Sequence, residues 1–470
     1  MNTTAPEPRI RPGTTVAGRV ESIAGDGRGV LSVGGREVLV RGAWPGDVVE
    51  ARIYRRRRGK LEAYALAVEE EGISRRQPPC VHVGECGGCV WQQWPISAQR
   101  EMKRCLVEQA LKSAMPDMPV EVLPTREVGP EFGYRNKMEF AFGRNPDGKA
   151  TLGLHRLGRF DATFDLVRCW IASPRASEAV AWVREWANRH GLAAYDGRTH
   201  EGILRYLVVR ESAATGEIMA NLVVADKAFE GLDDLADGLP HSLPQVVSLL
   251  LSVNARKGDT AIPEFTEVLA GQPSITERIG PLAVELSARS FLQTNTGGAA
   301  VLYEMVRERA ALAGSERVLD LYCGAGLIGL WLAGPAHTPP AREVVGVEQV
   351  PEAVADAERL RDRLGYEHVR FVRGDAERVL PAWAAEGESF DVAVVDPPRA
   401  GLHPKARAAL VALRPGRIVY VSCNPSSLAK DMNELIRAGY APGPVEPVDM
   451  FPQTAHVESL VRLDRRGQEP

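Results

Sequence analysis

The stretch Arg317-Val-Leu-Asp-Leu-Tyr-Cys-Gly-Ala-Gly326 has the pattern of a buried strand that runs directly into a glycine-rich turn. Residues 317–321 are mostly apolar, as expected of a strand that is covered on both faces. The glycines that follow let the backbone turn sharply and approach a ligand closely where the next helix begins. A strand, a glycine turn and a helix in this order are typical of an open α/β sheet, whose ligands lie at the carboxyl ends of the strands.

Four more β-rich runs follow and extend the same pattern. They are residues 343–347, 369–373, 391–395 and 417–421. The intervals between them are long enough for one crossover helix each, so these runs predict a parallel, doubly wound sheet. The last β-like segment, residues 446–464, would close this sheet as a hairpin.

The first 70 residues have a different pattern, in which short strands alternate with glycine-rich turns. Five strands in so few residues predict a small β-barrel of the OB type. The region from there to about residue 280 is mixed, with helix-like segments at 97–114 and 176–190 and β-like segments at 136–142, 203–210 and 217–224. The helix at 97–114 is expected to pack against the C-terminal domain. We therefore expect an α/β protein with a Rossmann-like C-terminal domain, an N-terminal OB-like β-barrel and a central α+β domain. The expected bounds of the three domains are 1–75 for the barrel, 76–280 for the central domain and 281–470 for the Rossmann-like domain.

The composition is that of an ordinary soluble globular protein. Of its 470 residues, 44% are hydrophobic and 25% are charged, which argues against disorder. No apolar run approaches the ~20 residues that span a bilayer. The polar N-terminus, Met1 to Arg11, lacks the apolar region of a signal peptide. We expect a cytoplasmic protein that does not bind membranes.

The charge of the whole chain does not favour nucleic acid, because the formal net charge is -4. Any RNA-binding surface must therefore be local. Residues 1–76 contain 14 Lys and Arg against 10 Asp and Glu, a local net charge of +4. Within them, the run Arg55 to Arg58 is either a solvated hairpin or an edge that contacts phosphates.

Carboxylates follow three of the predicted strands at the edge where a ligand would lie. Glu348 ends the second strand and suits two ribose hydroxyls, Asp375 follows the third and is placed to accept from an adenine amino group, and Asp396 follows the fourth. The run Gly324 to Gly329 also fits the dinucleotide fingerprint, so a nicotinamide dehydrogenase is an alternative. A dehydrogenase needs neither the Asp-Pro-Pro run that begins at Asp396 nor an exposed cysteine after the fifth strand. These two features favour a class I methyltransferase, whose first motif the glycine turn resembles.

Cys423 lies just after the fifth strand, in Ser-Cys-Asn-Pro (422–425). A strand cysteine most often packs as a small hydrophobe, but this one lies in a turn at the ligand edge. A thiolate there can add to carbon 6 of uracil, so that carbon 5 becomes nucleophilic enough to accept a methyl group, after which a base must remove the proton on carbon 5. Glu458 is the candidate base, because apolar neighbours would raise its pKa, and His456 is the competing candidate.

Asp-Pro-Pro also occurs in amino-methyltransferases that act on a base nitrogen and place an aromatic residue next. Here Arg399 stands at that position, which weakens this interpretation. An amino-methyltransferase and a non-catalytic RNA-binding protein with the same fold are the two alternatives.

Three of the seven cysteines gather in Cys80-x5-Cys86-Gly-Gly-Cys89. In a reducing cytosol such cysteines are metal ligands, nucleophiles or packing residues rather than a disulfide framework. The tight Gly-Gly turn brings two thiolates to one metal centre, and both zinc and an iron–sulfur cluster accept such ligands. The residues alone slightly favour zinc. Cys105 and Cys323 are expected to be packing residues.

The chain resembles the RNA 5-methyluridine (uracil-C5) methyltransferase family over nearly its whole length. The resemblance implies S-adenosyl-L-methionine as the methyl donor, Cys423 as the nucleophile and Glu458 as the base. The motifs that carry it are Ser-Phe-Leu-Gln-Thr-Asn (290–295), Asp-Leu-Tyr-Cys-Gly-Ala-Gly (320–326), Asp-Pro-Pro-Arg (396–399), Ser-Cys-Asn-Pro (422–425) and His-Val-Glu (456–458). The donor contacts that it implies are Gln293, Tyr322, Glu348, Asp375 and Asp396.

The resemblance extends to the first 280 residues. The barrel is similar to a TRAM domain, an RNA-binding module of the ribosomal RNA branch of this family. In TRAM-bearing relatives the spacing of Cys80, Cys86 and Cys89 holds a 4Fe–4S cluster, whose fourth ligand corresponds to Cys169. Arg135 would reach the substrate. The resemblance favours 23S ribosomal RNA over transfer RNA and a monomeric enzyme, but it leaves open the uridine and whether the cluster is structural or positions RNA.

Overall fold

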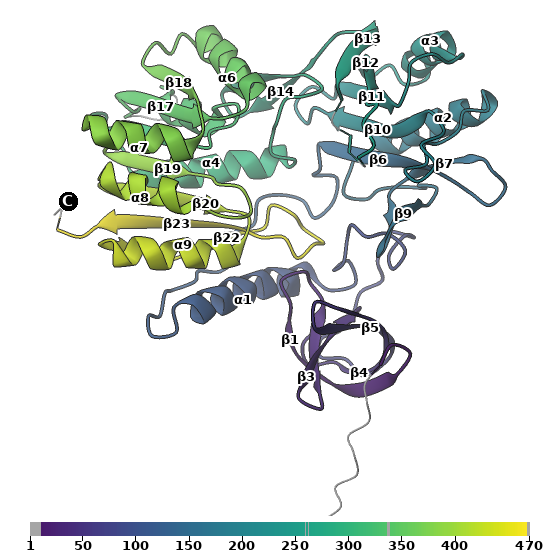
Figure 1. Cartoon of the computed structure of the whole chain (residues 1–470), viewed down its shortest axis with the longest axis horizontal. Helices are drawn as coiled ribbons and strands as arrows, with labels where there is room; N and C mark the ends of the chain where they lie inside the picture. The colour runs from purple at the N-terminus through teal and green to yellow at the C-terminus, as the bar shows by residue number, and fades with distance from the viewer. Residues whose placement is uncertain (1–10, 259, 262, 336–338, 468–470) are drawn as a thin grey trace, which may run out of the picture.

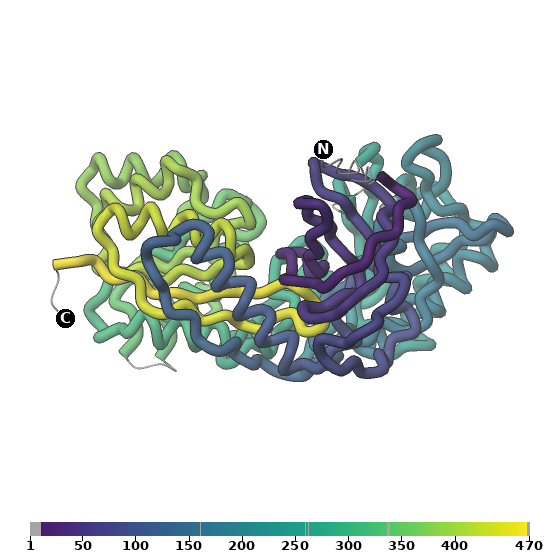
Figure 2. Tube along the Cα trace, turned by 90° about the horizontal axis from the view of Figure 1, so that it is seen from below, coloured from purple at the N-terminus to yellow at the C-terminus, as the bar shows by residue number. Residues whose placement is uncertain are grey.

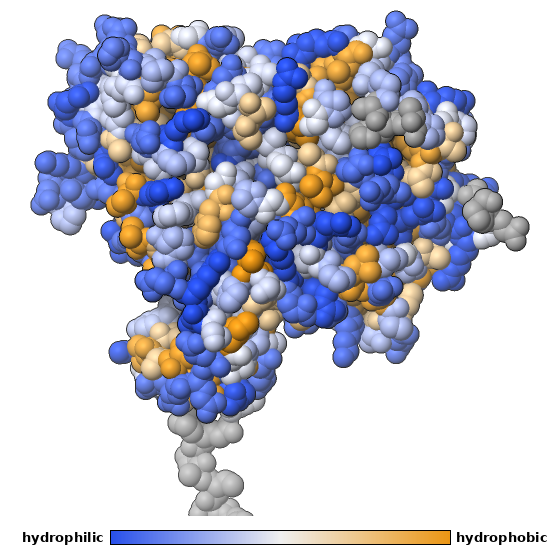
Figure 3. Space-filling model, turned by 180° about the vertical axis from the view of Figure 1, so that it is seen from behind, coloured by the Kyte–Doolittle hydropathy of each residue, from blue (hydrophilic) through white to orange (hydrophobic). Residues whose placement is uncertain are grey.

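A computed structural model of the chain describes residues 11–258, 260–261, 263–335 and 339–467. Figure 1 shows a small barrel at the N-terminal end, a mixed sheet flanked by helices α2 and α3, and a larger sheet with helices on both faces. From behind, the surface is mostly hydrophilic and its apolar side chains form separate small groups (Figure 3). Within the described ranges, no helix is both long enough and apolar enough to cross a membrane. The prediction that the N-terminus holds no signal peptide concerns residues 1–10, which lie outside those ranges.

The first five strands close into a barrel in the order β1-β2-β3-β5-β4. β3 and β5 are parallel, whereas β4 returns to pair antiparallel with β1 and so removes the open edge. Inward-facing side chains such as Val38, Val49 and Ile53 form its core. The predicted OB-like barrel is therefore confirmed. Its strands are β1 Thr15–Ile23, β2 Gly29–Val33, β3 Arg36–Arg41, β4 Val48–Arg57 and β5 Lys60–Glu70.

The central region forms a six-stranded sheet in the order β13-β12-β11-β10-β6-β7. Its topology is not encoded in a simple pattern, because β11 and β12 pair in parallel whereas the other neighbours are antiparallel. Two helices pack on it, α2 Pro174–Arg189 and α3 Leu232–Ser242. The strands of the sheet are β6 Lys137–Arg144, β7 Ala150–Gly153, β10 Leu204–Glu211, β11 Ile218–Val224, β12 Val246–Val253 and β13 Phe265–Gly271. Two short hairpins accompany it, β8 His155–Arg156 with β9 Arg159–Thr163, and β14 Ile275–Ile279 with β15 Leu282–Leu286.

The C-terminal region forms the predicted doubly wound sheet, in the order β18-β17-β16-β19-β20-β23-β21, with β22 paired to β23. The first five strands in space are parallel and β23 is antiparallel to β20, which confirms the Rossmann-like fold and its closing hairpin. The strands are β16 Arg317–Leu321, β17 Glu343–Glu348, β18 Val369–Arg373, β19 Val392–Val395, β20 Arg417–Ser422, β21 Tyr440–Pro442, β22 Glu446–Val448 and β23 Glu458–Arg465. The helices are α4 Thr296–Ala310, α5 Leu327–Ala333, α6 Pro351–Leu364, α7 Ala376–Glu386, α8 Pro404–Ala412 and α9 Pro425–Arg437.

Helix α1, Ile96–Ala114, joins the barrel side of the molecule to the C-terminal sheet. Its residues Val107 and Leu111 are buried in the same apolar cluster as Leu435 of α9, and Asn433 Nδ2 donates to the Ala114 carbonyl at 3.1 Å. Figure 2 shows this helix beside the C-terminal hairpin. Helix α1 lies within residues 76–280, the range predicted for the central domain, but it packs on the C-terminal sheet. The bounds of the three domains remain predictions.

Candidate active site

The glycine turn after β16 is held against the end of β17 by hydrogen bonds. Gly324 N–H donates to Glu348 Oε2 at 3.1 Å, and Val350 N–H donates to Glu348 Oε1 at 2.8 Å. Tyr322 has a φ of 62°, in the left-handed region where a bulky residue is uncommon. These contacts place the Glu348 carboxylate beside the turn, which is where the sequence predicts the ribose of a nucleoside to lie.

Asp320 anchors the same turn from inside the sheet. Its side chain is buried, and its Oδ2 accepts from Gly329 N–H of α5 at 2.8 Å. Burial raises the pKa of Asp320 to about 7. The interaction fixes where α5 begins, so that the backbone N–H groups of the glycine turn stay in place.

Asp375 and Asp396 lie at the ends of the two neighbouring strands. Gly374 N–H donates to the Glu348 carbonyl at 2.9 Å, so Asp375 follows directly beside the predicted ribose site. Asp396 N–H donates to the Leu321 carbonyl at 3.3 Å. Burial raises the pKa of Asp396 to about 7. Both predicted donor contacts therefore lie at the sheet edge that carries the glycine turn.

Gln293 reaches this edge from the segment between β15 and α4. Its carbonyl accepts from Asn136 Nδ2 at 3.0 Å, and Arg135 pairs with Asn295 in an isolated antiparallel bridge. A Cβ built on Gly324 would lie 3.9 Å from Phe291 Cδ1, so the segment lies next to the glycine turn. The central domain is thus joined to the segment that carries Gln293 through Arg135 and Asn136.

Cys423 and Glu458 are brought together by the antiparallel pairing of β20 and β23. Ser422 pairs with Ser459, and the next residues outward along the two strands are Cys423 and Glu458. Glu458 is only 4% exposed, and burial together with the charge of Asp396 raises its pKa to about 8. Burial and the charge of Glu458 also raise the pKa of Cys423, whereas Arg399 lowers it. The thiol of Cys423, whose pKa is raised, and the carboxyl group of Glu458 therefore share one partly desolvated edge.

His456, the competing base, lies further out on the loop. Its Nδ1 is 3.4 Å from Arg399 Nη2, and partial desolvation and the charge of Arg399 lower its pKa. Arg399 is also tied to the turn after β20, because its carbonyl accepts from Asn424 Nδ2 at 2.8 Å. The Asp-Pro-Pro-Arg turn thus contacts both the Cys423 turn and the loop before β23.

The four cysteines predicted as ligands line one cavity of about 380 Å³. They come from two parts of the chain, 80–89 and 169, and the other cavity-lining residues include Arg135 and Thr294. None of the seven cysteines, all of which lie in the described part of the chain, forms a disulfide. Within the described part of the chain, no group of three or more His, Cys, Asp or Glu side chains is placed to hold one metal ion.

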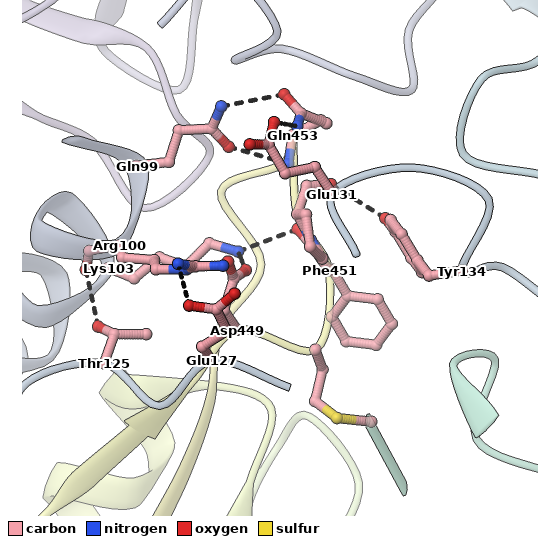
Figure 4. Close-up of polar contacts among 12 residues, drawn as sticks. Gln99, Arg100, Lys103, Thr125, Glu127, Glu131, Tyr134, Asp449, Phe451 and Gln453 are labelled. Carbon is pink, nitrogen blue, oxygen red and sulfur yellow. Dashed lines mark hydrogen bonds and ion pairs between the residues drawn. The ribbon is translucent and has the colours of Figure 1, made fainter. Parts of the chain in front are cut away.

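Several buried polar residues near the site were not singled out from the sequence. Figure 4 shows Gln99 and Lys103 of α1 in contact with the loop before β23, through Asp449, Phe451 and Gln453. A signal for them does exist, because residues 99, 103, 107 and 111 lie on one face of a helix at a spacing of four. A Gln and a Lys within an otherwise apolar stripe indicate buried polar partners.

The glycine turn, the Glu348 carboxylate and the strand-end aspartates on a doubly wound sheet define a class I methyltransferase. Residues 266–466 match the family model described as tRNA (uracil-5-)-methyltransferase. The chain is 36% identical to an uncharacterized RNA methyltransferase of Bacillus cereus over 461 residues, which are 98% of this chain and 99% of that protein. It is 37% identical to one of Caldanaerobacter subterraneus over 96% of this chain and 99% of that protein.

Among solved structures, the chain is similar to the tRNA (uracil-54, C5)-methyltransferase of Pyrococcus abyssi in complex with S-adenosyl-L-homocysteine. That likeness has a TM-score of 0.74 and 27% identity, and it covers 95% of this chain and 100% of the other. The chain belongs to the S-adenosylmethionine-dependent RNA (uracil-5-)-methyltransferase family.

Proposed function

We propose that this enzyme methylates carbon 5 of a uridine in ribosomal RNA, with Cys423 as the nucleophile and Glu458 as the base. The observation that carries the two assignments is the β20–β23 register, which makes Cys423 and Glu458 neighbours at the edge of the sheet where the strand that leads into the glycine turn also ends. Glu458 is preferred over His456 because it is the direct neighbour of Cys423 across the pair of strands.

The chain's own groups account for each bond that changes on the uracil ring. The Cys423 thiolate adds to carbon 6, and the electron pair moves to carbon 5 and oxygen 4 as an enolate. Carbon 5 accepts the electrophilic methyl group that S-adenosyl-L-methionine supplies, the methyl–sulfur bond breaks, and S-adenosyl-L-homocysteine is the leaving group. Glu458 then takes the proton from carbon 5, the double bond re-forms and the thiolate leaves. A base with a pKa of about 8 suits this step near neutral pH.

The donor would bind at the strand ends, where Glu348 accepts from the ribose hydroxyls and Asp375 from the adenine amino group. The positions of Gln293, Tyr322 and Asp396 around the same turn support their assignment to the donor site. Arg135, which pairs with Asn295 and lines the cysteine cavity, would contact the RNA.

A trapping experiment tests the nucleophile. RNA that contains 5-fluorouridine cannot lose the substituent on carbon 5, so the protein should stay covalently bound to it after methyl transfer. We expect this adduct on a denaturing gel for the wild type and none for Cys423→Ser. A stable adduct in Cys423→Ser, or none with any RNA in the wild type, would contradict the thiol mechanism. If Glu458→Gln instead releases product at the wild-type rate, the base assignment is wrong.

We also propose that Cys80, Cys86, Cys89 and Cys169 hold a 4Fe–4S cluster. Four thiols around one cavity support this donor set. The bound cluster would tie residues 80–89 to residue 169, and the proposed methyl transfer needs no electron from it. Protein purified without oxygen should contain about four iron atoms and about four sulfides per chain, and Cys86→Ser should contain far less. One zinc ion per chain and no sulfide would contradict the proposal.

Ribosomal RNA is proposed as the substrate because the barrel and the four cysteines resemble those of the ribosomal RNA branch. Transfer RNA is the second candidate, because the similar Pyrococcus abyssi structure is that of a transfer RNA enzyme. Mapping 5-methyluridine in both RNA pools of a deletion strain separates them. Loss of a 5-methyluridine from 23S ribosomal RNA supports the first candidate, and loss from transfer RNA alone overturns it.

A further inference from the structure

The loop between β22 and β23 is held by hydrogen bonds at successive residues (Figure 4). It precedes the proposed base Glu458, and its partners come from four separate parts of the chain. The Asn295 side chain donates to the Met450 carbonyl at 3.0 Å, Lys103 Nζ to the Phe451 carbonyl at 2.9 Å, the Tyr134 hydroxyl to the Pro452 carbonyl at 3.0 Å, and the N–H groups of Val90 and Trp91 to the Gln453 carbonyl at 3.1 and 3.0 Å.

Lys103 of α1 contacts this loop at two residues. Its side chain is fully buried, and besides the Phe451 carbonyl its ammonium group contacts the carboxylate of Asp449, which is 1% exposed. A lysine is seldom buried unless its charge is paired, so the pair fixes the helix and the loop relative to each other. Asp449 directly follows Val448, which is the register partner of Glu458. The Lys103–Asp449 pair therefore lies one residue along the chain from Val448, the residue that pairs with the proposed base Glu458.

Gln99, one helical turn before Lys103, contacts the same loop at Gln453. Its Nε2 donates to Gln453 Oε1 at 3.0 Å, and its Oε1 accepts from Gln453 N–H at 2.9 Å. Gln453 is fully buried and has a φ of 71°, a left-handed conformation that a glutamine adopts only when its surroundings impose it. The two reciprocal hydrogen bonds supply such a constraint.

We propose that Lys103 and Gln99 are positioning residues, which hold the 449–453 loop so that Glu458 meets the proton on carbon 5 of the methylated adduct. This inference rests on the proposed role of Glu458. Neither residue touches the reacting atoms. Their effect should therefore fall on the release of product, which needs the base, and not on the formation of the adduct, which needs Cys423.

Electrostatics gives a second readout. The charged and titratable groups that face Glu458 are Asp396 and Arg399 from the turn after β19, Lys103 from α1 and Cys423 from the turn after β20. Lys103 and Arg399 lower the pKa of Glu458, whereas Asp396 raises it. Removal of the Lys103 charge should therefore move the pH at which Glu458 ionises upward.

The test uses Lys103→Met/Asp449→Asn, which removes both charges of the buried pair. Arg100, the other partner of Asp449, keeps its ion pair with Glu127 at 2.6 Å. Gln99→Leu is the second variant, and Lys112→Met, on an exposed position of α1, is the matched control. With ordinary uridine RNA in a single turnover, product release should slow about 10- to 100-fold in the first two variants. Trapping by 5-fluorouridine RNA should keep its rate, and the release profile of the double variant should move to higher pH. Lys112→Met should match the wild type.

Parallel measurements on Glu458→Gln separate this inference from the function on which it rests. If Glu458→Gln accumulates the adduct but the double variant and Gln99→Leu release product normally, the positioning role is overturned and the base assignment stands. If Glu458→Gln itself releases product normally, the base assignment fails. An equal loss of trapping and release in the α1 variants also overturns the proposal, because the contacts would then serve the fold alone.

Discussion

Carboxyl groups buried at the strand ends determine how individual residues of this enzyme respond to pH. Asp320, Asp396 and Glu458 all have raised pKa values, and burial is the largest cause in each. A raised carboxyl pKa means that the folded protein holds a proton that the unfolded chain releases. For Glu458 the raised pKa favours a role as a proton acceptor near neutral pH. For Asp320 the raised pKa affects the stability of the fold.

Product release should depend on pH through Glu458. Because the proposed base must be ionised and its pKa is about 8, the release rate should rise as the pH increases from 6.5 to 9 and level off above the pKa. Single-turnover release with ordinary uridine RNA measures this profile. Glu458→Asp should keep a pH-dependent rise at a lower rate, whereas Glu458→Gln should be slow and flat. A wild-type profile that is flat over this range would contradict the prediction.

Asp320→Asn should change how stability depends on pH. Between the ordinary carboxyl pKa and about 7, the folded protein binds more protons at Asp320 than the unfolded chain does, so the free energy of unfolding falls as the pH rises. The Asn variant lacks this loss. Relative to the wild type it should gain about 2–4 kcal/mol between pH 5 and pH 8, as urea unfolding at each pH would show. The exposed Asp147→Asn is the control and should show no such gain.

At the scale of elements, the strand-to-helix turn after β16 depends on side chains from neighbouring elements. Gly326 has a φ of 72°, and a Cβ built there would lie 2.4 Å from Phe371 Cζ of β18. Gly365, at the end of α6, has a similar φ of 68° but has nothing within 4 Å of a built Cβ. The two glycines thus share a conformation and differ only in their surroundings.

Alanine at these two positions should separate conformation from contact. Gly365→Ala should lose about 1–2 kcal/mol of stability, which is the cost of a left-handed L-residue, and keep its affinity for S-adenosyl-L-homocysteine. Gly326→Ala should lose more, because Phe371 must move, and should bind that ligand at least about tenfold more weakly, a loss of about 1.4 kcal/mol. Chemical unfolding and titration calorimetry measure the two quantities. Equal losses in the two variants would contradict the role of Phe371.

Predicted and observed elements agree best where a strand or helix carries its own signal. The five parallel strands of the C-terminal sheet agree with prediction to within one residue at their ends, because each is a short apolar run bounded by turns. Strands β7, β12 and β13 of the central sheet, helix α3 and the short strand β21 were not predicted. The sequence of the central region shows no regular alternation of strands and helices. The pairing of its strands therefore depends on contacts between segments that are distant in the chain.

At the scale of the molecule, the barrel is joined to the catalytic sheet through a buried cluster of tryptophans. Trp44 of the barrel packs against Trp91 and Trp94, with ring centroids 5.3 and 4.6 Å apart, and Ala455 of the loop before β23 belongs to the same cluster. On the barrel surface, the hairpin of β4 and β5 carries exposed arginines and Tyr64, which is 41% exposed. This arrangement favours the barrel as an RNA-binding part of the molecule.

Replacement of Arg56, Arg57 and Arg58 by Gln should weaken RNA binding without changing the chemistry. The KM for RNA should rise, kcat should stay the same, and the slope of log affinity against log salt should fall by about 0.7–0.9 for each phosphate that an arginine no longer neutralises. Binding titrations at several salt concentrations and steady-state kinetics measure this. Arg437→Gln, an exposed position on α9, is the control. An unchanged KM and salt slope would show that the hairpin does not contact RNA.

The sequence by itself determined the fold class, the order of the strand-end motifs and the family, because each depends on residues that are close together in the chain. It also predicted which side chains would gather at the carboxyl ends of parallel strands, since topology alone brings those ends to one edge. Only the tertiary structure decided that Gln99 and Lys103 of helix α1 contact the loop before Glu458. The periodicity of apolar residues shows which face of a helix is buried. The segment that covers this face is distant in the sequence, so only tertiary packing determines which segment it is.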